Sequence, residues 1–307
     1  MARIRLEAWE PGQAEAWLEE GGAAVPALPA EEGPWEPRRE AARPPGPWVF
    51  VDGVERVEAL VWTEEGAPGL LFSYAVGAVV RDEGGIRLAG PVEVRRVFAS
   101  PRPFALELAP GLSFSPLKVE ALAPEDLLAA AREVRRRAEW ELGKRVLKDL
   151  PGALLFHDGP LFFGEGGEKR LGFVKSFHRR YLAEEHAGLL RRLAPGERTP
   201  VFRVPAEARR TPRDFFSWYL RLPLAPASPF SPSAGLIRVE TGALDVEEAK
   251  KLAAYSLYVL PRLASSPYRD PRAPANLLPV GGLERELKRR LGSRELIRRQ
   301  LVRHLAG

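Results

Sequence analysis

Two short stretches decide the fold: WVFVDGVERVE at residues 48–58 and LLFHDGPL at residues 154–161. Each is an apolar, strand-forming run that ends in an aspartate followed by a glycine, at Asp52 and at Asp158. A carboxylate at the end of a buried strand is costly unless it meets a cation. A bound metal ion is one solution, and an ordinary Asp-Gly turn is the other. For Asp52 taken alone, the turn is the favoured interpretation.

The chain around these stretches follows an α/β pattern. Residues 69–80 and about 86–98 are also strand-like and are separated by a turn, so three consecutive antiparallel strands are expected. Apolar residues at three- and four-residue steps predict the longest helix from Pro124 to Leu150. Further strands are expected at residues 171–174, 201–204, 215–222 and 235–240, and helices at residues 181–193, 246–260 and 282–304. This order predicts an RNase H-like mixed sheet flanked by helices, with additional N- and C-terminal helical elements.

The expected domain organisation is simple. Residues 1–47 are predicted to form an N-terminal helical segment and a Pro-rich, extended connector. Residues 48–307 are predicted to form one RNase H-fold domain, because the chain is long enough for one large domain.

Composition restricts the chemistry. The chain has 307 residues, no cysteine and four histidines, so a metal site is expected to use carboxylates, and zinc–thiolate sites and cysteine nucleophiles are excluded. The absence of cysteine agrees with a cytoplasmic location. No stretch approaches the roughly 20 apolar residues of a membrane helix. Lys and Arg number 46 against 41 Asp and Glu, and this net charge of +5 makes a polyanionic partner plausible.

The long predicted helix carries two candidate acids, Glu139 and Glu141. Both flank its apolar stripe, so periodicity does not separate them. The order strand-Asp, hairpin, helix-Glu, strand-Asp is the topology of RNase H-like nucleases, in which carboxylates gather around one or two divalent ions. Ligands that are all oxygen select hard ions such as Mg²⁺ or Mn²⁺.

The sequence resembles the NurA nucleases, particularly their bacterial branch. The resemblance runs from about residue 48 to 300 and is carried by the two Asp-Gly stretches, by LGFVKSFHRRYL at residues 171–182 and by PRAPANLLPVGGLERELKRRLG at residues 271–292. It implies Mn²⁺-dependent cleavage of DNA ends, with single-stranded exonuclease and endonuclease activity. It also implies a homodimer that docks on a hexameric HerA-type ATPase during end resection in recombinational repair.

The resemblance also implies roles for particular residues. Asp52 and Asp158 become metal ligands, and Glu139, in the segment RRRAE, becomes the helix carboxylate in preference to Glu141. Many relatives carry a histidine close to where Val280 and Gly281 stand, and this chain has no ligand there. Glu284 is the nearest acid and is expected to substitute as the fourth ligand. The alternative is that Glu284 is a first-turn acid favoured by the helix dipole.

Basic residues follow the strand at residues 171–174. Lys175 is expected to hold a scissile or neighbouring phosphate as a point charge, and a solvated surface lysine is the alternative. Further DNA-contact candidates are His178, Arg179 and Arg180.

An aromatic segment, FFSWYL at residues 215–220, has two interpretations: a stacking platform for single-stranded bases or part of the core, and the core is favoured. The basic residues 288–290 and 298–299 of the last helix are equally compatible with phosphate binding and with a solvated helix face.

Together these features predict a deoxyribonuclease that uses Mn²⁺ or Mg²⁺, processes DNA ends in the 5'-3' direction and acts with a HerA-type translocase. Two alternatives remain open. One is a non-catalytic DNA-binding or adaptor subunit of a translocase complex, which the missing C-terminal histidine favours. The other is an RNase H-like nuclease with a different substrate, such as a resolvase or an RNA-cutting enzyme.

Overall fold

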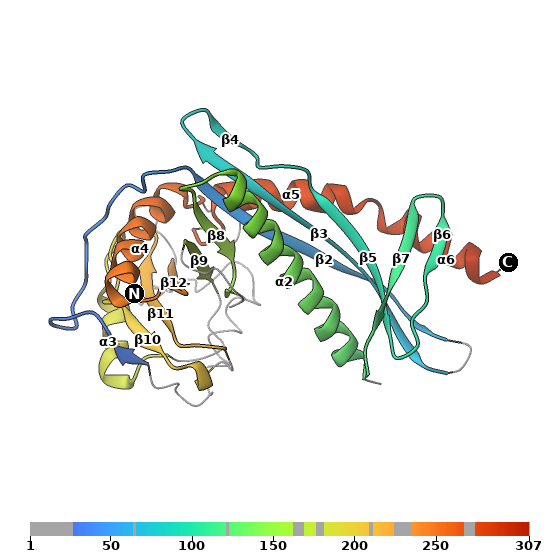
Figure 1. Cartoon of the computed structure of the whole chain (residues 1–307), viewed down its shortest axis with the longest axis horizontal. Helices are drawn as coiled ribbons and strands as arrows, with labels where there is room; N and C mark the ends of the chain where they lie inside the picture. The colour runs from blue at the N-terminus through green and yellow to red at the C-terminus, as the bar shows by residue number, and fades with distance from the viewer. Residues whose placement is uncertain are drawn as a thin grey trace, which may run out of the picture. The chain divides into compact units, whose positions relative to one another are not determined.

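The computed structural model describes residues 27–63, 66–120, 123–161, 169–175, 181–208, 211–223, 235–266 and 274–306 (Figure 1). The helix expected before residue 27 lies outside these residues, and the predicted domain boundary at residue 47 stays a prediction. The chain forms two compact units. Unit 1 comprises residues 1–50, 81–85 and 150–281, and unit 2 comprises residues 51–80, 86–149 and 282–307.

The sheet of unit 1 is mixed. Its strand order is β1-β10-β11-β12-β9-β8, followed by the first residues of β2. Strands β8 and β9 pair in parallel, and the pairs from β1 through β10, β11 and β12 to β9 are antiparallel. The bounds are β1 Leu28–Pro29, β8 Leu154–Asp158, β9 Arg170–Val174, β10 Phe202–Val204, β11 Phe215–Arg221 and β12 Leu236–Thr241. The strands predicted from residue 154 onward are therefore confirmed, with small shifts at their ends.

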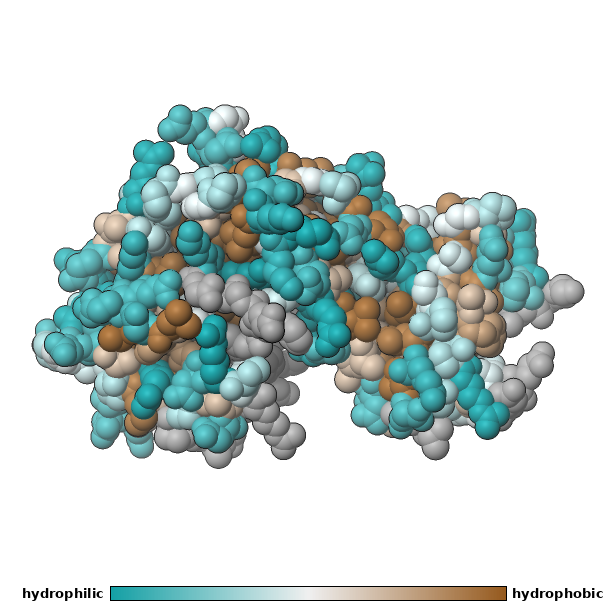
Figure 2. Space-filling view, in the orientation of Figure 1, coloured by the Kyte–Doolittle hydropathy of each residue, from teal (hydrophilic) through white to brown (hydrophobic). Residues whose placement is uncertain are grey.

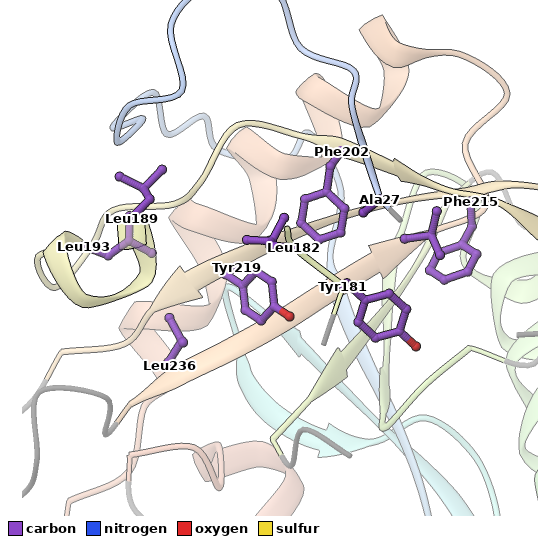
Figure 3. Close-up of a cluster of buried hydrophobic side chains, with 10 residues drawn as sticks. Ala27, Tyr181, Leu182, Leu189, Leu193, Phe202, Phe215, Tyr219 and Leu236 are labelled. Carbon is purple, nitrogen blue, oxygen red and sulfur yellow. The ribbon is translucent and has the colours of Figure 1, made fainter. Parts of the chain in front are cut away.

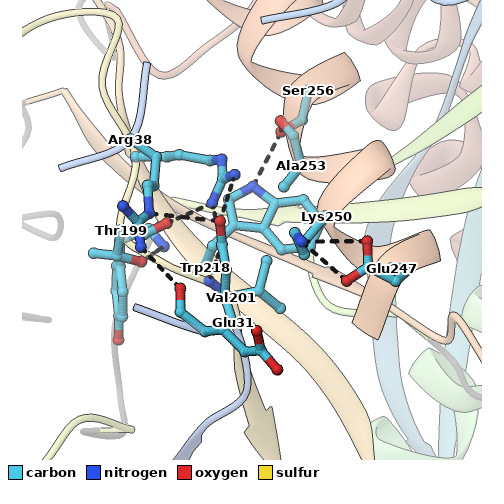
Figure 4. Close-up of polar contacts among 12 residues, drawn as sticks. Glu31, Arg38, Thr199, Val201, Trp218, Glu247, Lys250, Ala253 and Ser256 are labelled. Carbon is cyan, nitrogen blue, oxygen red and sulfur yellow. Dashed lines mark hydrogen bonds and ion pairs between the residues drawn. The ribbon is translucent and has the colours of Figure 1, made fainter. Parts of the chain in front are cut away.

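Helices α3, Glu184–Arg192, and α4, Val246–Val259, belong to unit 1, with the short 3-10 helices η1, Ala206–Ala208, and η2, Leu260–Leu263. Asp245 caps α4 by accepting a hydrogen bond of 2.8 Å from the Glu248 amide. Helix α4 lies against β11, where the indole of Trp218 donates to Ser256 Oγ at 3.0 Å (Figure 4).

A buried cluster packs on the same strands (Figure 3). It joins side chains from β10, β11, β12 and α3 with Tyr181 and Leu182. The aromatic segment at residues 215–220 contributes Phe215 and Tyr219 to this cluster, and Trp218 is fully buried. Four of the six residues of this segment have buried apolar side chains. For these four the core interpretation is correct, and they do not form an exposed platform for stacking bases.

The connector is extended and attached to unit 1 by ion pairs (Figure 4). Glu31 accepts hydrogen bonds from Arg198 Nη1 and from the Val201 amide, both at 2.8 Å, and lies 3.5 Å from Arg38. Burial raises the pKa of Glu31, but the hydrogen bond and charge of Arg198 outweigh it, and the pKa is lowered overall. A second pair joins Arg39 to Glu197 at 2.6 Å.

The sheet of unit 2 has the order β2-β3-β5-β7-β6, with β4 paired to β3. Its strands are β2 Trp48–Trp62, β3 Pro68–Asp82, β4 Gly85–Leu88, β5 Glu93–Ser100, β6 Leu106–Ala109 and β7 Leu112–Lys118. The expected strand at residues 86–98 is therefore two strands, β4 and β5. The break falls at Gly90, whose φ of 132° favours glycine, and at Pro91, which has no amide to donate.

Helix α2, Pro124–Asp149, confirms the longest predicted helix. It has acids in its first turn and Lys148 in its last, as the helix dipole favours. It contacts β5, and the side chains of Leu283 and Leu287 from α5 lie within 3.1 Å of a side chain added at Gly77 of β3. Because helices pack on it, β3 is buried from Pro68 to Val80.

The helix predicted at residues 282–304 is in fact two helices, α5, Leu278–Leu291, and α6, Arg294–Ala306. Gly292 separates them with a φ of 80°, a left-handed conformation that ends a helix. Arg56 and Arg96 donate to the carbonyls of Gly292 and Leu291, at 2.9 and 3.2 Å. These tertiary bonds satisfy carbonyls at the break that periodicity alone does not detect.

The predicted α/β class, with a mixed sheet flanked by helices, is thus confirmed. The expected order of strands, a long helix and a further strand is present, but in the part of the chain that the structure describes six strands, β2 to β7, precede α2 where three were expected, and β8 follows it. Within the described residues no helix is both long and apolar enough to cross a membrane. The visible face of the molecule carries mainly hydrophilic side chains, with apolar ones gathered in smaller areas (Figure 2).

Candidate active site

Asp52 lies in β2 and is half-buried in unit 2. Its Oδ1 accepts a hydrogen bond of 2.8 Å from the amide of Gly53. A Cβ at Gly53 would collide with Oε1 of Glu139 and come 3.1 Å from Nη1 of Arg135. Glycine at this position is therefore what allows the helix carboxylate to approach the strand.

The structure separates the two helix acids. Glu139 is buried and faces β2. Its Oε1 accepts a hydrogen bond from Arg135, one turn earlier in the same helix. Glu141 is exposed on α2 and pairs with Lys144 at 3.2 Å. Of the two acids, Glu139 therefore lies beside the Asp52-Gly53 peptide, whereas Glu141 points to solvent.

Arg135 was not a candidate in the sequence. Its Nε donates to Glu55 at 2.9 Å and its Nη1 to the carbonyl of Gly53 at 3.2 Å, as well as to Glu139. Burial lowers the pKa of Arg135, but the charges of Glu139, Glu55 and Asp52 outweigh it, and the pKa is raised overall. The four-residue spacing of Arg135 and Glu139 on one helix face is the signal that could have found it.

Asp158 and Lys175 form the corresponding group of unit 1. Lys175 Nζ lies 2.6 Å from Oδ2 of Asp158 and 3.2 Å from Oδ1 of Asn276, and it is 5.4 Å from the ring centroid of Phe173. The side chain of Lys175 is 18% exposed, so it is not a freely solvated surface lysine. Asn276 is buried, and sequence reasoning missed it.

The turn after Asp158 is held from two sides. The Gly159 amide donates to the carbonyl of Phe173 at 2.9 Å, and the Leu161 amide donates to Oε1 of Glu240 at 2.7 Å. A Cβ at Gly172 would come 2.7 Å from the carbonyl oxygen of Gly159, so this close approach requires glycine. Glu240 is fully buried and also pairs with Arg238 at 2.5 Å.

His157, beside Asp158, is not suited to proton transfer at neutral pH. Burial, together with the charge of Arg170, lowers its pKa to about 3. The imidazole therefore stays uncharged through the physiological range.

Glu284 lies in α5 and accepts a hydrogen bond of 2.8 Å from Lys288, one turn further on. Helix α5 begins at Leu278 and has no acid in its first turn, so the first-turn alternative for Glu284 is wrong. Arg289 and Arg290, near the end of this helix, both pair with Glu286. They belong to a solvated, charge-balanced helix face.

The remaining sequence candidates, His178, Arg179 and Arg180, lie outside the described residues. Over the residues that the structure does describe, no group of three or more histidines, cysteines, aspartates and glutamates is arranged to hold a metal ion. The side chains gathered beside Gly53 nevertheless fit a hard divalent cation by donor type, because Asp52 and Glu139 offer carboxylate oxygens alone.

Comparison with known proteins identifies the family. Residues 49–280, well over half of the chain, match the family model described as the NurA domain. This chain belongs to the NurA family. Asp52, Glu139, Asp158 and Lys175 of this NurA chain fall within the matched range, and Glu284 falls outside it.

Among solved structures, the crystal structure of the NurA nuclease from Sulfolobus solfataricus is similar to this NurA chain. The two are 11% identical, with a TM-score of 0.49, and the similarity covers 88% of this chain and 87% of that chain. No curated protein matches the chain.

Proposed function

We propose that this NurA family member is a divalent-metal-dependent deoxyribonuclease. The observation that carries the proposal is the carboxylate of Glu139 set beside the Asp52-Gly53 peptide, at a point where a Cβ does not fit. Burying an acid against a strand that carries another acid at the neighbouring position is costly, and it is understandable where the two share a cation.

Asp52, Glu139 and Asp158 are the proposed ligands of Mn²⁺ or Mg²⁺. What supports this set is its chemistry, since all three side chains offer carboxylate oxygens, the donors that hard divalent ions prefer. When bound, the ion supplies an activated water and stabilises the leaving oxygen.

Lys175 is proposed to neutralise a phosphate of the DNA. In the DNA-free chain its ammonium is placed by Asp158 and Asn276, at 2.6 and 3.2 Å. An ammonium has three donors, so it can keep one of these partners while it contacts a phosphate oxygen. We assign His178, Arg179 and Arg180 to contacts with the DNA backbone on sequence position, and Glu284 to a supporting role at the ion.

The finer functional assignment follows the family resemblance. We propose that the protein acts as a homodimer with a HerA-type hexameric ATPase, on single-stranded DNA and DNA ends in the 5'-3' direction, during end resection and recombinational repair. Glu284 as fourth ligand and the domain boundary at residue 47 belong to the same proposal.

The test is degradation of end-labelled single-stranded DNA with Mn²⁺, with Mg²⁺ or with EDTA. The chain should cut in either metal and not in EDTA, and Asp52→Ala, Glu139→Gln and Asp158→Ala should each abolish cutting because each removes a ligand charge. Glu141→Gln is the matched control, because Glu141 is two residues further along the same helix and is exposed, and this variant should cut normally.

The same assay distinguishes the adaptor alternative. If the chain retains DNA in a gel-shift measurement but cuts nothing in any metal, with or without a HerA-type ATPase, the nuclease proposal is wrong. Cutting that survives Asp52→Ala and Asp158→Ala would instead show that the ligands have been misassigned.

A further inference from the structure

A positive charge, the guanidinium of Arg135, already lies among the carboxylates of Glu55 and Glu139 in unit 2. It is part-buried and donates to three groups at once: Glu55, the carbonyl of Gly53, and Glu139. Two of these groups lie on β2 and one on α2, so Arg135 connects the strand to the helix at the height of Asp52.

The neighbours of Arg135 are strongly acidic. The charges of Glu139, Glu55 and Asp52 all act on it. Arg132 balances part of this charge, since its Nε lies 2.6 Å from Glu55, but its side chain is 51% exposed and the ion pair is with Glu55. Arg135 is therefore a part-buried positive charge in direct contact with the helix carboxylate.

A guanidinium and a divalent cation are both attracted to the carboxylate of Glu139, but they need not bind the same lone pair of its oxygens. A carboxylate has about four lone-pair sites, so Glu139 can keep its bond to Arg135 on Oε1 and still offer an oxygen to an ion. The positive charge of Arg135 nevertheless opposes the approach of a second cation. Glu55 and the Gly53 carbonyl anchor Arg135 independently of Glu139, so it is not free to move away.

We infer that Arg135 is a positioning residue that holds the Glu139 carboxylate against β2 in the ion-free protein and weakens the affinity of the site for a divalent cation. The inference rests on the proposed function, in which Asp52 and Glu139 are ligands. Arg135 would stabilise the acidic site when it is empty, and it would keep binding of the ion reversible.

The experiment compares Arg135→Met with Arg132→Met in the full chain. Two quantities are measured: the melting temperature in EDTA and in Mn²⁺, and the dissociation constant for Mn²⁺ by titration calorimetry. Arg135→Met should melt several degrees lower in EDTA, because the acids then lose the positive charge of Arg135 that reduces their mutual repulsion. Mn²⁺ should raise its melting temperature by about 3 °C more than it raises that of the native chain.

The affinity measurement separates a positioning role from a merely structural one. Arg135→Met should bind Mn²⁺ roughly fivefold more tightly, since a like charge has been removed beside the ligands. Arg135→Lys, which keeps the charge but cannot span three partners, should melt lower in EDTA and bind Mn²⁺ with nearly native affinity. Arg132→Met should leave the affinity unchanged.

Other outcomes overturn the inference. Native or weaker Mn²⁺ affinity in Arg135→Met would do so. If Arg135→Met does not fold in EDTA, Arg135→Gln takes its place, and failure of both to fold even with Mn²⁺ would show that an ion cannot take over the charge. If the native chain binds no Mn²⁺ and Asp52→Ala changes nothing, the proposed function has failed, which is a different result from native affinity in the variant.

Discussion

At the level of the residue, Gly53 is the glycine that bears on the proposed site. A side chain there would collide with Oε1 of Glu139, which faces β2 from α2. A flexible lysine or arginine could swing away from such a contact, but the carboxylate of Glu139 is held by Arg135. Asp52, the proposed metal ligand, is the residue before Gly53 in β2, so the position of the Glu139 carboxylate affects the proposed ion site directly.

Gly53→Ala should therefore displace Glu139 and abolish Mn²⁺-dependent DNA cutting, with a loss of about 1–3 kcal/mol in the free energy of unfolding from overpacking. Single-turnover cleavage and urea unfolding measure the two effects. Gly188→Ala is the matched control, because nothing lies within 4 Å of a Cβ there. Native cleavage by Gly53→Ala would mean that Glu139 is not needed in its observed place.

A second residue-scale prediction concerns pH. The pKa of His157 is about 3 in the folded chain against 6.5 ordinarily, so between these values the unfolded chain binds a proton that the folded chain does not. Stability contributed by neutral His157 is therefore present above pH 6.5 and falls as the pH drops below it, by about 1 kcal/mol per pH unit. Urea unfolding between pH 7 and 5 should show a smaller decline in His157→Gln than in the native chain. Equal slopes would contradict the burial argument.

At the level of the element, the break between α5 and α6 shows how a local signal and a tertiary one combine. Gly292 takes a left-handed φ of 80°, which glycine adopts without strain. The exposed carbonyls at the break are then bonded by Arg56 and Arg96 from the sheet of unit 2. The helical periodicity of residues 282–304 continues across the break, so the pattern alone predicts one helix.

Gly292→Ala should lower the free energy of unfolding by about 1 kcal/mol, because alanine disfavours this conformation. Gly282→Ala within α5 is the control: nothing lies near its Cβ, and alanine favours a helix, so stability should be unchanged or higher. Thermal unfolding of the two variants side by side measures the difference. The prediction is contradicted if Gly292→Ala is at least as stable as the native chain, which is expected if the helix continues through position 292 in the variant.

At the level of the whole molecule, the chain forms two compact units, and each contains part of the proposed chemistry. Unit 1 holds Asp158 and Lys175, and unit 2 holds Asp52 and Glu139. Unit 1 also incorporates the connector through the buried pair of Glu31 and Arg198, whose side chains are 8% and 3% exposed (Figure 4). The connector is thus part of the fold of unit 1.

Glu31→Gln should lower the free energy of unfolding by about 2–4 kcal/mol at pH 7, because it leaves Arg198 buried without its charged partner. The lowered pKa of Glu31 means that its contribution is present above the ordinary value of 4.5 and is lost as the pH falls through the folded value. Glu83→Gln, which removes an exposed pair with Arg43, should change stability by less than about 1 kcal/mol. Denaturant unfolding at pH 7 and pH 4 checks both, and a Glu31→Gln effect as small as that of Glu83→Gln would exclude a role for the buried pair.

The sequence by itself determined the elements that have a strong local pattern. Strands β2, β3 and β8, helix α2 and the aspartate that ends β8 follow from apolar periodicity and from an Asp-Gly step, which are properties of neighbouring residues. At Asp52 the same step does not end the strand, because β2 continues to Trp62. The family resemblance rests on the same stretches.

Tertiary structure decided which of these residues are brought together. Glu139 and Glu141 are equivalent in periodicity, and only the packing of α2 on β2 buries one and exposes the other. The partners Arg135 and Asn276 and the break at Gly292 depend likewise on contacts between residues far apart in the chain. Local pattern specifies secondary structure because backbone hydrogen bonding is local, whereas burial and charge pairing arise when distant segments pack, and no short stretch of sequence contains that information.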